Sequence, residues 1–128
     1  MLKRIGRYFA GVCLLFAFGL AAASERPFDQ AAFEHLKAEG KPVVVYFHAT
    51  WCPTCKIQQP IVDRLSASAD LKGVTLFEAD YDKEVALKRA LRVTQQSTFV
   101  VFKNGHEVAR STGETTEPAI KSTLDKAL

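Results

Sequence analysis

The most informative stretch of this chain is Trp51-Cys52-Pro53-Thr54-Cys55-Lys56. Its two thiols stand three positions apart, after a strand with a buried pattern and at the start of a predicted helix. A helix N-terminus offers unpaired N–H groups and a partial positive charge, which can lower the pKa of a cysteine from about 8.5 to roughly 3.5–7.5. The Cys-x-x-Cys spacing alone also fits half of a zinc site, so the surrounding sequence has to decide between the two.

The segments around the two thiols alternate between strand and helix patterns. Val43 to Phe47 is a continuous β-branched and aromatic run, typical of a central strand that is buried on both faces. This order predicts an α/β fold with a central mixed sheet flanked by helices on both faces, and it places the thiols at the carboxyl end of the first central strand. The other predicted elements are helices over 28–39, about 52–68, 83–91 and from Thr116, and strands over 74–79, 98–102 and 107–110, the last two joined by Asn104-Gly105.

The first 23 residues differ in character from the rest of the chain. Three basic residues precede an apolar run from Tyr8 to Leu20, and Ala21-Ala22-Ala23 then offers the small residues that a signal peptidase recognises. We expect a signal peptide over 1–23, cleaved after Ala23, and one domain over 24–128 in the periplasm. The apolar run is short for a membrane span, which needs about 20 residues; an uncleaved inner-membrane anchor facing the periplasm is the alternative.

The composition of the chain is typical of one globular domain and gives no indication of nucleic-acid binding. The chain has 128 residues and is 48% hydrophobic, enough for one globular domain with a core. Three of its 17 basic residues and none of its 14 acidic ones lie in residues 1–23, so the remainder carries 14 of each. That balance gives no indication of nucleic-acid binding. Cys52 and Cys55 are the only cysteines after residue 23. In an oxidising compartment such a pair indicates a reactive site more than a structural disulfide.

On these features the chain resembles the thioredoxin-fold family. Phe47 to Lys56 resembles the family's strand end, tryptophan and active-site pair, and Thr98 to Gly105 resembles the strand and hairpin that follow its substrate loop. Gly113 falls where the family has a glycine beside the active-site groove. The stretch from Lys41 to Cys55, together with the predicted signal peptide, is similar to exported bacterial members such as the C-terminal domain of the periplasmic electron-transfer protein DsbD.

The resemblance implies thiol–disulfide exchange without a bound organic cofactor. Cys52 would be the exposed nucleophile that attacks a substrate disulfide, and Cys55 the more buried thiol that resolves the mixed disulfide. Trp51 would form a flat wall of the substrate surface, although a tryptophan that only packs is the alternative. The positions expected to contact substrate are Trp51, Pro53, Thr54, Gln96, Ser97 and Gly113.

One departure from the family lies in the substrate loop. The family commonly has a cis-proline just before the threonine that opens the strand facing the active site, and here that position is Ser97. A cis bond before serine costs about 2.5–4 kcal/mol, against about 0.5–1 kcal/mol before proline. Either the fold imposes a strained cis bond, or the loop is trans and moves. Gln96 and Ser97 are therefore expected to alter substrate affinity or choice.

A second departure is Tyr46, which replaces the family's buried acid six residues before the nucleophile. Tyrosine has a pKa near 10 and is a poor base at neutral pH, so another group or water must take the proton of the resolving cysteine. Glu78 on the next predicted strand is a candidate helper, and a solvated surface glutamate is the alternative. Lys56, next to the second cysteine, is a further possible modulator.

His48 completes a His-x3-Cys-x2-Cys pattern. Two thiolates and an imidazole could hold copper(I) or zinc, so a non-catalytic client- or metal-binding module is the alternative function. We expect instead an exported thiol–disulfide oxidoreductase that acts in redox homeostasis, holds no metal and is a monomer. The dipeptide Pro53-Thr54 lacks the histidine of strongly oxidising members, which favours a reductant or electron relay. Its partners would be protein thiols or disulfides and a membrane electron-transfer protein.

Overall fold

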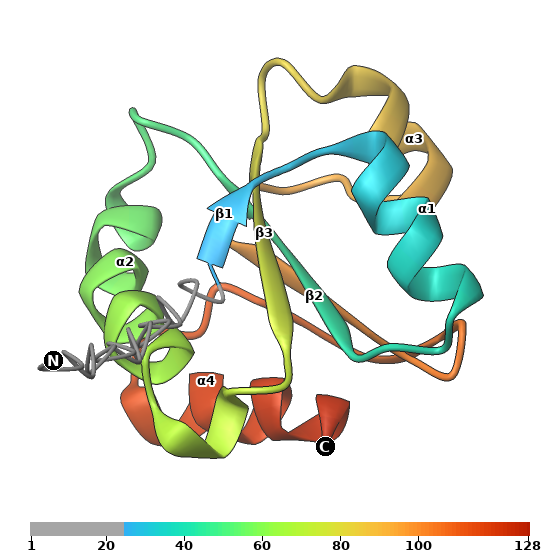
Figure 1. Ribbon diagram of the computed structural model, residues 1–128. Helices are drawn as coiled ribbons and strands as arrows, with labels where there is room; N and C mark the ends of the chain where they lie inside the picture. Colours follow the sequence, from blue (N-terminus) through green and yellow to red (C-terminus); the bar gives the residue numbers. More distant parts are fainter. Residues whose placement is uncertain (1–24) are drawn as a thin grey trace, which may run out of the picture.

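A five-stranded mixed sheet with the strand order β1-β3-β2-β4-β5 forms the centre of the molecule (Figure 1). The computed structural model describes residues 25–128, so the predicted signal peptide over 1–23 lies outside the described residues. β2 runs parallel to β3 and antiparallel to β4, and β5 pairs antiparallel with β4. The predicted mixed α/β sheet is therefore confirmed.

The predicted elements are all present, with ends that shift by a few residues. Asp29 caps the first helix, since its side chain accepts a hydrogen bond from the Ala32 N–H, so that helix begins two residues later than expected. The order along the chain is β1 Glu25–Pro27, α1 Gln30–Ala38, β2 Val43–His48, α2 Pro53–Ser66, β3 Thr75–Asp80, α3 Val85–Leu91, β4 Thr98–Lys103, β5 His106–Thr112 and α4 Glu117–Leu124, with short 3-10 turns at Ala69–Leu71 and Asp125–Ala127.

The strand β2 supplies both halves of the core, because its successive side chains point to opposite faces of the sheet. Val44 and Tyr46 belong to one apolar cluster, with residues of α2 and α4, and Val43, Val45 and Phe47 belong to the other, with residues of α1 and α3. All five are buried. The sheet is therefore covered on both faces, with α1 and α3 on one side and α2 and α4 on the other (Figure 1).

The hairpin between β4 and β5 turns at Asn104-Gly105, as the sequence predicted. Both residues have positive φ, 54° and 81°, which is the backbone that a two-residue hairpin of this kind requires. A Cβ on Gly105 would lie 3.3 Å from the Lys37 carbonyl oxygen, so this glycine also lets the hairpin approach the end of α1.

One strand was not predicted. β1 has only three residues, Glu25 to Pro27, without an apolar alternation, and it is held as an edge strand by parallel pairing with Leu76 to Glu78 of β3. Its position brings Glu25 to the face of the sheet that α2 covers. Within residues 25–128 no helix has the length and apolar character needed to cross a membrane.

Candidate active site

The two cysteines lie where β2 gives way to α2. β2 ends at His48, and Cys52 is the N-cap residue of α2, with Pro53 in the first helical position, where no backbone donor is needed. Cys52 and Cys55 are joined in a disulfide with their Cα atoms 5.2 Å apart. The Cys52 Sγ accepts a hydrogen bond from the Cys55 N–H at 3.1 Å. A donor aimed at this sulfur stabilises a thiolate there once the bond is reduced.

Both cysteines are buried in this oxidised state, with 0% of Cys52 and 4% of Cys55 exposed. The expectation of an exposed Cys52 is therefore wrong for the disulfide form. The physical reason is the cap: the Cys52 sulfur turns back over the first turn of the helix toward the Cys55 N–H. The pair forms a small apolar cluster with Ala49, and Tyr81 packs against it. The separate roles of the two thiols stay predictions.

Trp51 is the exposed aromatic residue beside the disulfide, with 54% of its surface accessible. Its indole Nε1 donates a 2.7 Å hydrogen bond to the Asp82 carboxylate, in the turn after β3. Pro53 and Lys56 are exposed and Thr54 is half-buried on the first turn of α2. The ring of Trp51 thus stands at the surface, and its role as a wall of the substrate surface stays a prediction.

Tyr46 lies fully buried beneath the second cysteine. Its hydroxyl donates a 3.4 Å hydrogen bond to the Cys55 carbonyl, and its ring stacks on Phe99 with 4.6 Å between ring centroids. Burial raises the pKa of Tyr46 well above its usual range, and the nearby carboxylate of Glu78 raises it further. The residue that replaces the family's acid therefore acts as a packed hydrogen-bond donor to the active-site helix and takes no proton at neutral pH.

Glu78 is half-buried and has partners, so its interpretation as a solvated surface glutamate is wrong. Its carboxylate accepts a 2.7 Å hydrogen bond from Gln59 Nε2 and lies 3.8 Å from His48 Nε2. Burial acts to raise the pKa of Glu78, but the hydrogen bonds from Glu25 and Gln59 and the nearness of His48 outweigh it, and the pKa of the carboxyl is lowered.

His48 turns toward this carboxylate, and its ring stacks on Tyr46 with 5.4 Å between centroids. Among residues 25–128, the only possible metal ligands that gather in a group of three or more belong to Glu25, Asp63 and Glu78. His48 therefore does not join the two cysteines in a ligand set. The pattern His-x3-Cys-x2-Cys is not a preformed metal site in this disulfide form.

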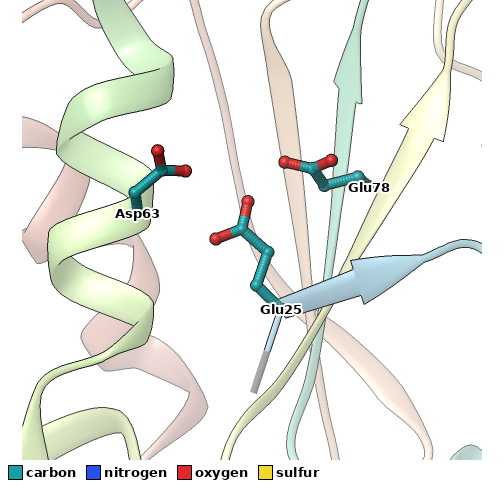
Figure 2. A group of neighbouring side chains, drawn as sticks. All are labelled: Glu25, Asp63 and Glu78. Carbon is teal, nitrogen blue, oxygen red and sulfur yellow. The ribbon is translucent and has the colours of Figure 1, made fainter. Parts of the chain in front are cut away.

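Glu25, Asp63 and Glu78 form an acidic cluster in which each carboxylate points toward the others from a different element, β1, α2 and β3 (Figure 2). Gln59 Nε2 lies within 2.7–3.1 Å of an oxygen of each one. Burial raises the pKa of Glu25 to about 7, helped by its hydrogen bond to Glu78 and by the charges of Glu78 and Asp63. Glu25 thus keeps its proton to a higher pH than an ordinary glutamate, and the cluster ties the edge strand to the sheet and to α2.

The loop over residues 95–97, here the Ser97 loop, contains no cis bond, so the trans alternative is the correct one. Ser97 instead has a φ of 55°, in the left-handed region that costs a serine of the order of 1–3 kcal/mol. Its carbonyl accepts the Gly113 N–H at 3.0 Å. The structure thus brings two of the predicted substrate-contact positions, Ser97 and Gly113, into direct contact, with Gln96 half-buried beside them.

Three residues near the site were missed from the sequence. Gln58 is fully buried on α2 and bonds to the Ser97 loop. Tyr81 packs against the disulfide cluster and donates to the Thr94 carbonyl at 3.0 Å, and Asp82 holds Trp51. Tyr81 and Asp82 directly follow β3, so their place at the carboxyl end of a central strand could have indicated them. Gln58 carried no such signal.

Comparison with known proteins agrees with this geometry. The sequence model of the family described as "Thioredoxin" matches residues 24–126. The chain is 34% identical over 101 residues to Thioredoxin Asp f 29 of Aspergillus fumigatus, covering 78% of this chain and 91% of the relative. It is 35% identical over 101 residues to a thioredoxin of Mycolicibacterium smegmatis, covering 78% and 90%.

Among solved structures, Trxlp from Edwardsiella tarda EIB202 superposes with a TM-score of 0.75 at 38% identity, covering 78% of this chain and 97% of that one. The family match spans nearly all the residues that form the sheet, its covering helices and the disulfide at the start of α2. The chain therefore belongs to the thioredoxin family, and its Cys52–Cys55 pair makes it a thiol–disulfide oxidoreductase.

Proposed function

We propose that this thiol–disulfide oxidoreductase is exported and works as a reductant or electron relay for protein disulfides. The observation that carries the direction is the hydrogen bonding of the Cys52 sulfur. It accepts the Cys55 N–H, and no cationic side chain among residues 25–128 contacts it. His48, the nearest histidine in the sequence, pairs with Glu78 instead. With one backbone donor and no cation, the Cys52 thiolate is less stabilised than the thiolate of strong oxidants, so the reduced form is the stronger electron donor.

The chemical step is a two-electron exchange. The Cys52 thiolate attacks one sulfur of a substrate disulfide and forms a mixed disulfide, while the other substrate sulfur leaves as a thiolate and takes up a proton. Cys55, as its thiolate, then attacks Cys52 and releases the second substrate thiol. The substrate disulfide is reduced, and the Cys52–Cys55 disulfide seen in the structure is the oxidised product.

The substrate surface in this proposal consists of Trp51, the first turn of α2, and the Ser97 loop with Gly113. Trp51 is exposed, and the backbone N–H of Gln96 has no hydrogen-bond partner among the described residues. A free N–H in this loop can pair with the backbone of an extended polypeptide. A reductant in an oxidising compartment also needs a continuous supply of electrons, so we propose that a membrane electron-transfer protein is its partner. We also propose that the protein is a monomer.

The test is the equilibrium potential of the Cys52–Cys55 pair in glutathione buffers. A value near about −270 mV supports a reductant, whereas a value near about −120 mV overturns the direction. A Cys52→Ser variant that keeps full biological activity would overturn the enzymatic role in favour of client binding. Intact-mass measurement of the product from cells tests export, because cleavage after Ala23 leaves a chain that begins at Ser24.

A further inference from the structure

Gln58 connects the active-site helix to both loops of the proposed substrate surface. It lies one turn after Cys55 on α2 and is fully buried. Its side-chain Nε2 donates to the Glu114 carbonyl at 2.8 Å and to the Ser97 carbonyl at 3.4 Å. One amide therefore reaches two loops that are separated from it by 39 and 56 positions in the sequence.

The orientation of this amide is fixed by its partners. Both are carbonyl oxygens, which accept only, so the NH2 group must face them. The amide oxygen of Gln58 then has no hydrogen-bond partner among the described residues. An unpartnered buried acceptor is unfavourable, and an apolar residue of similar volume would avoid that loss. Stability alone therefore gives a weak reason for an amide at this position. The role of Gln58 lies in the loops that its NH2 group holds.

The NH2 group of Gln58 holds a loop whose backbone has an uncommon conformation. Ser97 is trans with a φ of 55°, and its carbonyl accepts from Gly113 N–H as well as from Gln58. The neighbouring Thr98 Oγ1 bonds to the Gln95 carbonyl and to Thr112 Oγ1, each at 2.8 Å. These bonds pin both ends of the loop between α2 and the end of β5, and the N–H of Gln96 has no hydrogen-bond partner within residues 25–128.

We propose that Gln58 is a positioning residue that holds the Ser97 and Glu114 loops against the active-site helix and thereby sets the affinity of the enzyme for polypeptide disulfides. The inference rests on the proposed substrate surface. A small disulfide has no backbone to pair with the loop. Gln58 therefore acts on the binding of polypeptide disulfides and leaves the sulfur chemistry unchanged.

The experiment compares Gln58→Met with the wild type on a polypeptide disulfide, insulin, and on a small aromatic disulfide. Loss of the two donated bonds is expected to raise KM for insulin about tenfold while kcat stays within about twofold. The rate with the small disulfide is expected to stay within about twofold. Gln59→Met is the matched control: Gln59 is the next residue on α2, but it bonds to the acidic cluster and to neither loop, so KM for insulin should not change.

An unchanged KM for insulin in Gln58→Met, or an equal loss on both substrates, overturns the positioning role. If Gln58→Met does not fold, Gln58→Leu, which also lacks the donors, is measured in the same way and decides by the same split between substrates. A wild-type protein that reduces neither substrate refutes the proposed function itself. A wild type active on both substrates, with a variant that matches it on insulin, refutes the inference alone.

Discussion

The indole Nε1 of Trp51 and the carboxylate of Asp82 are joined by a 2.7 Å hydrogen bond across 31 positions of the sequence. The bond ties the turn that precedes the active-site helix to the turn that follows β3. An exposed ring has many accessible rotamers, and this contact selects one of them beside the disulfide. The orientation of the Trp51 ring is therefore set by Asp82, in the turn that follows β3.

We predict that Asp82→Ala frees the ring of Trp51. Because Trp51 is the only tryptophan, fluorescence anisotropy reports on it directly and should fall, and KM for insulin should rise about threefold, as for the loss of one exposed hydrogen bond. Asp82→Asn keeps an acceptor oxygen and should retain the anisotropy of the wild type. An unchanged anisotropy in Asp82→Ala would show that the bond does not orient the ring in solution.

We predict that Cys55→Ser stops the reaction at the mixed disulfide. Without a resolving thiol, the adduct formed by Cys52 has no intramolecular exit, so a disulfide-bonded peptide should add its mass to the protein. Cys52→Ser should form little adduct under the same conditions, because the helix-capping sulfur is gone. Intact-mass spectra of the two variants check the roles, and the reverse result would exchange them.

We predict that Tyr46→Phe lowers the free energy of unfolding by about 1 kcal/mol, the usual worth of one hydrogen bond. The lost bond is the 3.4 Å contact from the hydroxyl to the Cys55 carbonyl, and the stacking on Phe99 remains. Urea unfolding measures the change. The pH dependence of the exchange rate should match that of the wild type, because burial raises the pKa of Tyr46 well beyond the working range. A pH profile altered by this substitution would instead assign Tyr46 a proton-transfer role.

We predict that the acidic cluster makes stability depend on pH. The pKa of Glu25 rises from its ordinary value of 4.5 to about 7 on folding. Between those values the folded chain holds a proton that the unfolded chain has lost, so stability falls as pH rises through this window. The stability is fully present below about pH 4.5 and lost above about pH 7. The lowered pKa of Glu78 acts in the opposite sense, with stability lost as pH falls below its ordinary value.

Glu25→Gln should remove the decline between these pH values. A glutamine keeps a donor for Glu78 without a titrating charge, so the variant should exceed the wild type by about 1 kcal/mol above pH 7, after discounting for solvent around a partly exposed cluster. Glu34→Gln is the control, since Glu34 is exposed on α1 and bonds to Gln30. Urea unfolding at a series of pH values provides the measurement. If the free energy of unfolding fell with pH equally in the wild type and in Glu25→Gln, Glu25 would not be the group that causes the decline.

The sheet and its helices could be predicted because their signals are local. Val43 to Phe47 is apolar without interruption, and Asn104-Gly105 fits one turn type, so both were recognisable without tertiary contacts. β1 had no such signal. Its three residues Glu25 to Pro27 are held by pairing with β3, and nothing within the segment itself favours a strand.

The site was predictable only where its chemistry lies in one short stretch. Cys52 and Cys55 could be identified from their spacing, but the burial of Cys52 depends on the direction of its sulfur over the helix. Gln58 was not identified because a glutamine on an amphipathic helix normally faces solvent. Here two distant loops cover that face and bond to it. Such long-range cover has no signature in the local pattern.

The disulfide cluster of Ala49, Cys52 and Cys55 is separate from the two large apolar clusters of the sheet, and Tyr81 packs against both it and the cluster that α1 and α3 cover. Breaking and remaking the sulfur–sulfur bond therefore changes the packing of a few side chains at one end of the molecule. Partial unfolding exposes apolar surface and leads to aggregation, and a bond that lies outside both large cores can be cut without opening either of them.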